Sequence, residues 1–218
     1  MELERKSCRG RNTRAAKGAA TFCRTTGTRR TPYAGTPPWD IGRPQMPFIE
    51  LANGDRLRGR VLELGCGTGE HTLLAAERGL QATGVDLAPR AIAKARAKAQ
   101  LRGRDARFLI LDALTVDSLG ETCDMVIDCG FFHVLSDAAR ARLGEVLRRV
   151  MAPGATYYLL CFSDKVPGDT GPRRIHRDEF RTAFADGFSV DSITESSIEA
   201  TFLDVPVPAW LATITRRA

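Results

Sequence analysis

A doubly wound α/β fold is predicted by the order of segments between residues 58 and 218. Short apolar runs typical of buried strands alternate with amphipathic segments typical of helices, and glycine or proline separates most of them. Such alternation implies a mostly parallel sheet with helices on both faces, connected by right-handed crossovers. The chain has 218 residues and 43% hydrophobic content, which suffices for one core, so we expect a single domain.

The elements are assigned from residue periodicity and from capping residues. Strands are expected at residues 60–65, 81–86, 106–112, 123–130 and 155–163. Helices are expected at 71–79, 89–103, 136–154 and 176–187. The third helix begins at a Ser136 cap, carries Leu143, Leu147 and Val150 on one apolar stripe, and ends at Pro153-Gly154. Two last strands, 188–202 and 209–217, predict a C-terminal antiparallel hairpin at one sheet edge.

The net charge of +6 is concentrated at the N-terminus. Residues 1–31 hold nine lysines and arginines against two acidic residues, whereas residues 32–218 hold twenty-three against twenty-four. We expect residues 1–31 to form a disordered basic tail, because their low apolar content cannot offset the entropy of ordering. A targeting or nucleic-acid-binding arm is the alternative. The balanced charge of residues 32–218 indicates that no nucleic acid is bound.

Residue spacing bears on compartment and metal content. No apolar run is long enough for a membrane span, and the N-terminus lacks an apolar signal core. The six cysteines form no CxxC pair and no paired spacing with histidine, so neither a metal site nor a disulfide framework is indicated. We expect a reduced cytoplasmic protein without a membrane partner. A monomer is expected, with the oligomeric state left open.

A glycine-rich turn follows the first expected strand, in the stretch ELGCGTGEH. Gly65, Gly67 and Gly69 permit a tight turn and close approach of the backbone to a ligand. The spacing differs from the dinucleotide motif G-x-G-x-x-G, because the third glycine comes one residue early. The flanking Glu63 and Glu70 would repel pyrophosphate and attract a cationic group. The turn therefore favours a cationic nucleoside over NAD.

Two aspartates follow the next two expected strands. Asp86 comes seventeen residues after Gly69, near the distance at which such folds present a carboxylate to ribose hydroxyls. Asp112 follows the third strand, in a position suited to an adenine amino group. Each aspartate alone is equally well explained as a loop or helix-cap residue. Together with the glycine turn, they predict a nucleoside site.

These stretches resemble the class I S-adenosylmethionine-dependent methyltransferases. VLELGCGTG, GVDLAPRAIAKAR, LDAL and CDMVIDCGFFHVL occur in the usual order of that family, and the resemblance covers residues 32–218. It implies a Rossmann-like fold and S-adenosylmethionine as cofactor, with the glycine turn at the methionine part, Asp86 at the ribose and Asp112 at the adenine. The cofactor-binding residues that it implies are Trp39, Glu63, Gly65, Cys66, Gly67, Gly69, Asp86, Leu87, Asp112, Ala113 and Asp128.

Two further stretches resemble the thiol, halide and thiopurine branch of that family. TPPWDIGRPQMPFIEL, in a cap segment of residues 32–57, places Trp39 as an apolar wall over the sulfonium and Asp40 near the acceptor. SDKVPGDTGPRRIHRDEF forms a lid loop, residues 163–175, in which Arg173 binds an anionic acceptor. The alternatives are that Trp39 only anchors the segment and that Arg173 is a solvated loop charge.

The resemblance implies methyl transfer to a small-molecule nucleophile by in-line displacement. Phe131 and Phe132 are expected to line an apolar acceptor pocket. His133 is the candidate catalytic residue, as a base or an orienting group, and the alternative is a structural residue bonded to the backbone. Thiols, sulfide and halides are the expected acceptors, with O- or N-methylation of a quinol, phenol or heterocyclic toxin as the alternative. Left open are an RNA- or protein-directed methyltransferase, a nicotinamide-dependent oxidoreductase and a non-catalytic nucleoside-binding protein.

Overall fold

The computed structural model describes residues 33, 35–168 and 171–218, and the expected basic tail, residues 1–31, lies outside them. In chain order the elements are α1 (Met46–Asn53), β1 (Arg60–Leu64), α2 (Glu70–Glu77), β2 (Gln81–Asp86), α3 (Pro89–Leu101), β3 (Arg107–Ile110), η1 (Ala113–Leu119), β4 (Cys123–Cys129), η2 (Phe132–Val134), α4 (Asp137–Val150), β5 (Met151–Phe162), α5 (Arg177–Ala183), β6 (Phe188–Ile198) and β7 (Val207–Arg216). The strands and helices expected from the sequence are all present, with shifted ends. The helix α1 and the two 3-10 helices, η1 and η2, are additional.

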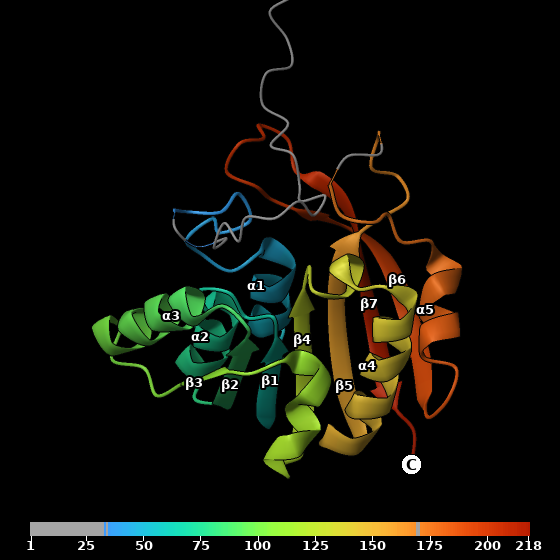
Figure 1. Cartoon of the computed structure of the whole chain (residues 1–218), viewed down its shortest axis with the longest axis horizontal. Helices are drawn as coiled ribbons and strands as arrows, with labels where there is room; N and C mark the ends of the chain where they lie inside the picture. The colour runs from blue at the N-terminus through green and yellow to red at the C-terminus, as the bar shows by residue number, and fades with distance from the viewer. Residues whose placement is uncertain (1–32, 34, 169–170) are drawn as a thin grey trace, which may run out of the picture.

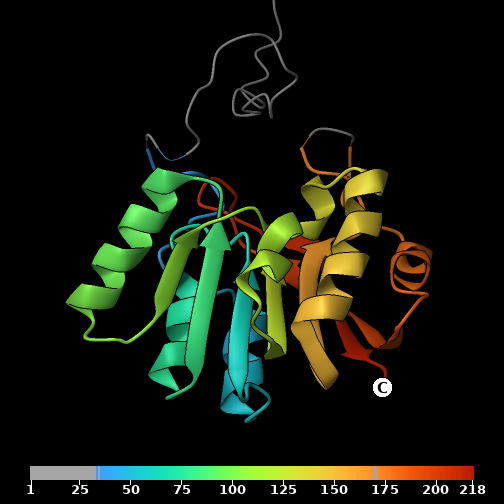
Figure 2. The same ribbon diagram turned by 60° about the horizontal axis from the view of Figure 1, so that its bottom comes forward.

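The seven strands of the described residues form one sheet in the order β3-β2-β1-β4-β5-β7-β6. Strands β1 to β5 are parallel, whereas β7 runs antiparallel to both β5 and β6. The predicted parallel sheet with a C-terminal antiparallel hairpin at one edge is therefore confirmed (Figure 1, Figure 2). The order of the strands reverses between β1 and β4. In sheets of this kind, ligands bind beyond the carboxyl ends of the strands at that switch point.

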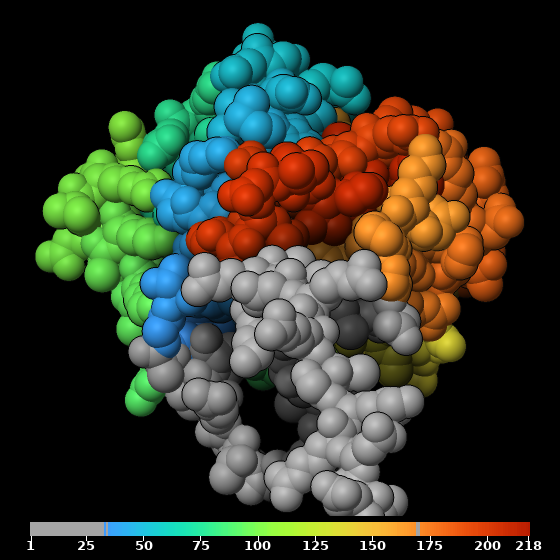
Figure 3. All heavy atoms as spheres, turned by 90° about the horizontal axis from the view of Figure 1, so that it is seen from above, coloured from blue at the N-terminus to red at the C-terminus, as the bar shows by residue number. Residues whose placement is uncertain are grey.

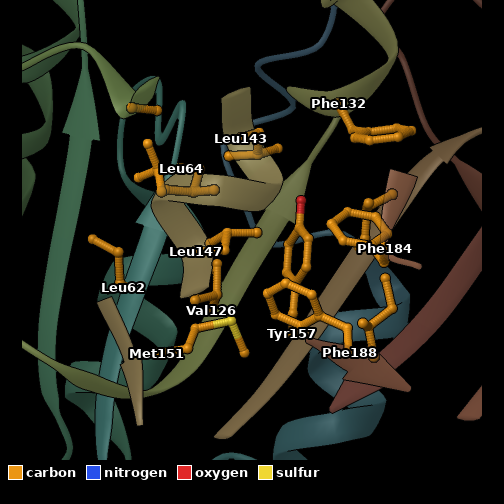
Figure 4. Packing of buried hydrophobic residues seen from close by; sticks show 14 of the residues in the cluster. Leu62, Leu64, Val126, Phe132, Leu143, Leu147, Met151, Tyr157, Phe184 and Phe188 are labelled. Atoms are coloured by element: carbon orange, nitrogen blue, oxygen red, sulfur yellow. The ribbon is translucent and has the colours of Figure 1, made fainter. Parts of the chain in front are cut away.

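Alternate residues of the central strands enter apolar layers on opposite faces of the sheet. In β5, Tyr157 packs in the layer that includes α4 and α5, whereas Tyr158 packs in the layer that includes α1 and α2. The stripe predicted on α4 is confirmed, because Leu143, Leu147 and Val150 are all buried in the first layer (Figure 4). Burying one such leucine contributes about 1.5–3 kcal/mol, so these layers hold the strand ends at the switch point in place.

The two ends of α4 compare differently with the prediction. Ser136 caps the helix as expected, since its Oγ accepts the backbone N–H of Ala139 at 3.3 Å. The predicted stop at Pro153 is wrong: the helix ends at Val150, and β5 begins at the next residue. The pairing of β4 with β5 shifts its register over residues 152–155, and proline is tolerated in such an irregularity because no ladder hydrogen bond is needed there. No helix of the described residues is long and apolar enough to span a membrane.

Candidate functional site

The glycine turn, residues 65–69, joins β1 to α2 at the switch point. Gly65, Gly67 and Gly69 have φ angles of +61°, +54° and +85°, in the region that other residues rarely adopt. A Cβ on Gly69 would lie 2.6 Å from the ring of Phe108, so this glycine allows close packing against β3. A Cβ on Gly67 would instead meet the hydroxyl of Tyr33 at 3.0 Å. The middle of the turn therefore faces the cap segment.

Cys66 lies within the turn as a buried thiol. Its backbone N–H donates to the carbonyl of Val85 at 2.9 Å, which ties the turn to β2. Burial raises the pKa of the Cys66 thiol, so the side chain stays protonated. Cys66 is therefore a packing residue of the turn.

Asp86, at the end of β2, faces the glycine turn. One carboxylate oxygen accepts the N–H of Gly67 at 2.9 Å, and the other accepts the N–H of Ala88 at 2.7 Å. Burial raises the pKa of this carboxyl, and the two backbone donors partly oppose that effect. Each oxygen keeps a further lone pair, which a ribose diol can use. The position agrees with the role that the sequence predicts.

Asp112 and Ala113 begin η1 after β3. The side chain of Asp112 accepts the N–H of Leu114 at 2.9 Å, so this aspartate is a helix cap, as one of the two interpretations proposed. Ala113 is buried. Leu87 is 66% exposed and Ile110 is 52% exposed, and they stand at neighbouring strand ends. These two side chains leave apolar surface open for a flat ring such as adenine.

Glu63 lies inside the protein, 2% exposed, below the glycine turn. Its Oε1 accepts the Nδ1–H of His71 at 2.8 Å, and its Oε2 accepts the backbone N–H of Thr72 at 2.7 Å and the hydroxyl of the same residue. Against the effect of burial, the Glu63 carboxylate raises the pKa of His71. The backbone N–H of Gln45 nevertheless donates to Nε2 of His71 at 3.2 Å, which leaves no room for a second proton, so the ring is neutral with its proton on Nδ1. Glu63 thus joins β1 to α2 and to the cap segment.

Glu70 is bound by α3. Its carboxylate pairs with Lys98 at 2.6 Å and with Arg102 at 2.9 Å. Glu63 and Glu70 are therefore both engaged by protein groups, and the expectation that they jointly attract a cationic ligand is wrong. The reason is the direction of α2, which begins at Glu70 and carries that side chain toward α3. The turn accommodates a nucleoside through its backbone and through Asp86.

Tyr33 is the residue of this site that the sequence reasoning missed. Only 8% of it is exposed, and its hydroxyl, which lies over Gly67, accepts the indole N–H of Trp39 at 3.4 Å. The two rings meet edge to face, with centroids 6.4 Å apart. Burial raises the pKa of Tyr33, so the phenol remains neutral. Trp39 is 41% exposed, and together the two rings cover the glycine turn with aromatic surface.

The cap segment is fastened to the connection between β6 and β7, residues 199–206, which lies beside it (Figure 3). Gln45 is 3% exposed, and its side-chain amide exchanges two hydrogen bonds with the backbone of Glu199, at 2.8 and 3.0 Å. The N–H of Thr201 donates to the carbonyl of Pro38 at 2.8 Å, and Arg43 pairs with the Glu199 carboxylate at 2.6 Å. The N- and C-terminal parts of the domain therefore meet above the strand ends.

Asp128, at the end of β4, organises the loop that follows. The carboxylate is fully buried and accepts the N–H of Phe131 at 2.8 Å, the N–H of Phe132 at 3.0 Å and the hydroxyl of Tyr157 at 2.8 Å. Burial raises the pKa of Asp128 to about 7, against the effect of these donors. Asp128 thus fixes the backbone of η2 from within the core, rather than facing a ligand.

The two phenylalanines of this loop point in different directions. Phe131 approaches the turn, since a Cβ on Gly65 would lie 3.1 Å from its ring. Phe132 has no exposed surface and stacks on Phe180 of α5 with centroids 6.0 Å apart (Figure 4). The expectation that Phe132 lines a pocket is therefore wrong, because η2 turns it into the core.

His133 is 6% exposed and is held by β5. The N–H of Phe162 donates to its Nδ1 at 3.0 Å, and the rings of the two residues lie 4.7 Å apart. Burial, with a further contribution from the charge of Arg140, lowers the pKa of His133 to about 3. The bond to the backbone is the one that the structural interpretation of this histidine expected.

Two charged residues predicted near the acceptor have protein partners. Arg173 pairs with Asp137 and Glu179 at the first turns of α4 and α5, so its guanidinium is balanced within the fold. Asp40 lies 3.9 Å from Lys98, with its side chain 11% exposed. An anionic acceptor would have to displace a carboxylate from Arg173.

Comparison with known proteins decides the family. Residues 61–154 match the family described as "Methyltransferase domain". The chain is 32% identical over 170 residues to the 2-heptyl-1-hydroxyquinolin-4(1H)-one methyltransferase of Mycobacteroides abscessus, which covers 77% of this chain and 75% of that protein. The chain belongs to the S-adenosylmethionine-dependent methyltransferases. The sequence-based expectation of a class I enzyme that uses this cofactor on small molecules is confirmed.

Other relatives of this methyltransferase agree. The demethylmenaquinone methyltransferase of Thermus thermophilus is 40% identical over 114 residues, about half of each chain. The solved structure titled "Conversion of a Disulfide Bond into a Thioacetal Group during Echinomycin Biosynthesis" superposes with a TM-score of 0.78 at 34% identity, over 85% of this chain and 88% of its own. Magnesium protoporphyrin IX methyltransferase from Synechocystis, solved with bound S-adenosylmethionine, shares the fold at 20% identity and a TM-score of 0.60, over 79% of this chain and 77% of its own.

Proposed function

We propose that this enzyme methylates an oxygen or a ring nitrogen of a small aromatic heterocycle or quinol. The observation that carries the proposal is the 32% identity, over three quarters of both chains, to an enzyme named for a hydroxyquinolinone. The name of the Thermus thermophilus relative likewise denotes a fused ring system with oxygen substituents. The thiol and halide acceptors expected from the cap segment find no support among these relatives, and they are retained only as arms of the test.

The residues at the switch point fit S-adenosylmethionine. Gly67 leaves space under Tyr33, Asp86 offers lone pairs for the ribose hydroxyls, and the open surfaces of Leu87 and Ile110 suit the adenine. When bound, the cofactor supplies a methyl carbon on a sulfonium sulfur, and transfer to oxygen forms the O–C bond as the C–S bond breaks and S-adenosylhomocysteine is left. The donor is thus already activated, so the protein contributes binding, alignment and exclusion of water.

The aromatic residues around the turn suit a flat acceptor. Tyr33 and Trp39 cover the turn from the cap segment, and Phe131 approaches it from the loop after β4. Aromatic walls bind a planar ring over a large area while losing little conformational entropy. We propose that the acceptor ring binds between these walls, and that the lid loop, whose described residues are 163–168 and 171–175, bounds the same space.

The test is a methyl-transfer assay on the purified full chain that follows release of S-adenosylhomocysteine. The panel holds 2-heptyl-1-hydroxyquinolin-4(1H)-one, a demethylnaphthoquinol, simple phenols, a heterocyclic amine, a small thiol, sulfide and iodide. Turnover on the oxygen or nitrogen heterocycles and not on the sulfur or halide arms supports the proposal. Turnover confined to thiols, sulfide or iodide overturns it and returns the assignment to the thiol and halide branch.

The cofactor site has its own test. Asp86→Ala should weaken binding of S-adenosylhomocysteine by about 100-fold, the equivalent of roughly 3 kcal/mol for lost bonds to a charged group. Isothermal titration calorimetry measures this directly, and Asp112→Ala, which removes a helix cap, is the matched control for loss of a carboxylate near the same edge. Unchanged affinity in the Asp86 variant would place the cofactor elsewhere.

A further inference from the structure

His133 is held in a single orientation by groups on both sides of it. Its backbone belongs to η2, which the Asp128 carboxylate fixes through the N–H groups of Phe131 and Phe132. Its ring packs against Phe162 at 4.7 Å between centroids. Only 6% of the residue is exposed. The imidazole therefore has little freedom to exchange its two nitrogens.

The proton of the ring is assigned by the bond from β5. A backbone N–H is always a donor, so Nδ1, which receives the N–H of Phe162 at 3.0 Å, must present a lone pair. In a neutral imidazole the other nitrogen then carries the proton. Within the described residues, Arg140 of α4 is the charged group that acts on this ring, and together with burial it keeps the pKa of His133 low, near 3. The ring is thus neutral at physiological pH, with its proton on Nε2.

The protonated nitrogen has space in front of it. No residue of the described chain makes a hydrogen bond to Nε2. Gly130, with φ at +81°, is the residue that leaves this space, since a Cβ there would lie 3.2 Å from Nε2. An unpartnered donor in a nearly buried position is unfavourable unless a ligand satisfies it. This donor lies just beyond the carboxyl end of β4, beside the switch point.

We propose that His133 is a fixed hydrogen-bond donor, and not a base, whose Nε2–H binds an oxygen of the methyl acceptor. This rests on the proposed function, and it adds that the acceptor presents an oxygen lone pair, as a carbonyl or an oxyanion, to that position. His133 takes no proton during the reaction. A hydroxyl that is methylated loses its proton to water before it binds, and the Nε2–H then stabilises the resulting oxyanion by a charge-assisted bond.

His71 offers an internal contrast. It is also buried, but its Nδ1–H donates to Glu63 and its Nε2 accepts the N–H of Gln45, so it holds the opposite tautomer. The chain contains three histidines, and the third, His176, has a side chain that is 70% exposed. Three ring systems in three different environments make their signals separable by imidazole ¹⁵N spectroscopy.

The first experiment is two-bond ¹H–¹⁵N correlation NMR on the full chain labelled at histidine, between pH 5.5 and 8.5, with His133→Gln used for assignment. The expected result is a bare Nδ1 and a protonated Nε2 on His133 at every pH, and the reverse pattern on His71. A proton on Nδ1 of His133, or titration of His133 within this range, would overturn the inference. The measurement needs no acceptor, so its outcome is independent of whether the proposed function holds.

The second experiment compares three variants on the acceptor that the wild type methylates fastest. His133→Gln places an amide N–H near the position of Nε2, His133→Asn keeps only an acceptor for the Phe162 N–H, and His133→Ala keeps neither. We expect kcat/KM to fall about 30-fold for the alanine and asparagine variants and about fivefold for glutamine, with the affinity for S-adenosylhomocysteine changed by less than twofold. Equal kcat/KM in the wild type and the alanine variant overturns the inference. Absence of turnover in the wild type on every oxygen acceptor refutes the proposed function instead.

Discussion

Replacement of Asp128 by asparagine should make the protein's stability less sensitive to rising pH. The carboxyl is fully buried, and its burial raises the pKa from 3.8 to about 7 in the folded chain. Because the folded pKa lies above the unfolded value, the folded state binds the proton more tightly. The resulting stability is fully present below pH 3.8 and is lost as the pH rises through about 7. The asparagine side chain in the Asp128→Asn variant does not ionise and has no such dependence.

The magnitude follows from the two pKa values. Between pH 5 and pH 8 the linkage relation gives a loss of about 2.5 kcal/mol in the wild type relative to Asp128→Asn. For a chain of this length, that corresponds to roughly 5–10 °C in the difference of melting temperatures. The asparagine oxygen can accept from the backbone N–H groups of Phe131 and Phe132. Its amide can donate to the Tyr157 hydroxyl, so the variant retains the geometry of the loop.

Urea unfolding of both proteins at half-unit steps from pH 5 to pH 8 measures the effect, and all other titrating groups cancel in the difference. The free energies of unfolding of the two proteins should approach each other or cross as the pH rises. Parallel curves would refute the reasoning, since they would mean that Asp128 is ionised in the folded state throughout this range. Tyr157→Phe should enlarge the pH dependence, because it removes a donor that favours the ionised carboxylate.

Two further predictions concern stability. Gly69→Ala should destabilise the fold by about 2–4 kcal/mol in urea unfolding, through overpacking against Phe108 and the positive φ, whereas Gly79→Ala, with a φ of +76° and open space around it, should lose only about 1 kcal/mol; equal losses would contradict the steric argument. Gln45→Ala should lower the free energy of unfolding by about 1–3 kcal/mol, because the backbone of Glu199 loses two partners, while Arg43→Ala, which breaks a half-exposed ion pair, should change it by less than about 1 kcal/mol.

The fold and the main cofactor contacts could be predicted because they depend on local pattern. Strand and helix periods, the Ser136 cap and the three glycines are properties of short windows of sequence. Asp86 was found in the same way, since its position relative to the glycine turn follows from the length of one strand-helix-strand unit. In these cases, the sequence spacing sets the spatial position almost directly.

Other features depend on the direction of a side chain or on contacts between distant segments. Phe131 and Phe132 are adjacent and chemically identical, and only the turn of η2 sends one of them into the core. The charge of Glu70 is removed by residues 28 and 32 positions further along the chain. Nothing near Tyr33 in sequence indicates that it lies over Gly67. The tautomer of His133 likewise depends on a backbone N–H that is 29 residues away.

The double bond between Gln45 and Glu199 joins positions 154 residues apart, and this separation has a consequence for synthesis of the chain. The glycine turn, Asp86 and the loop after β4 are all translated before residue 134, but the aromatic cover over them has no anchor until residue 199 exists. A chain that stops short of the β6–β7 connection would carry the cofactor contacts and leave them open to water. The latch thus couples completion of the polypeptide to closure of the site, so that truncated products are poor competitors for the cofactor.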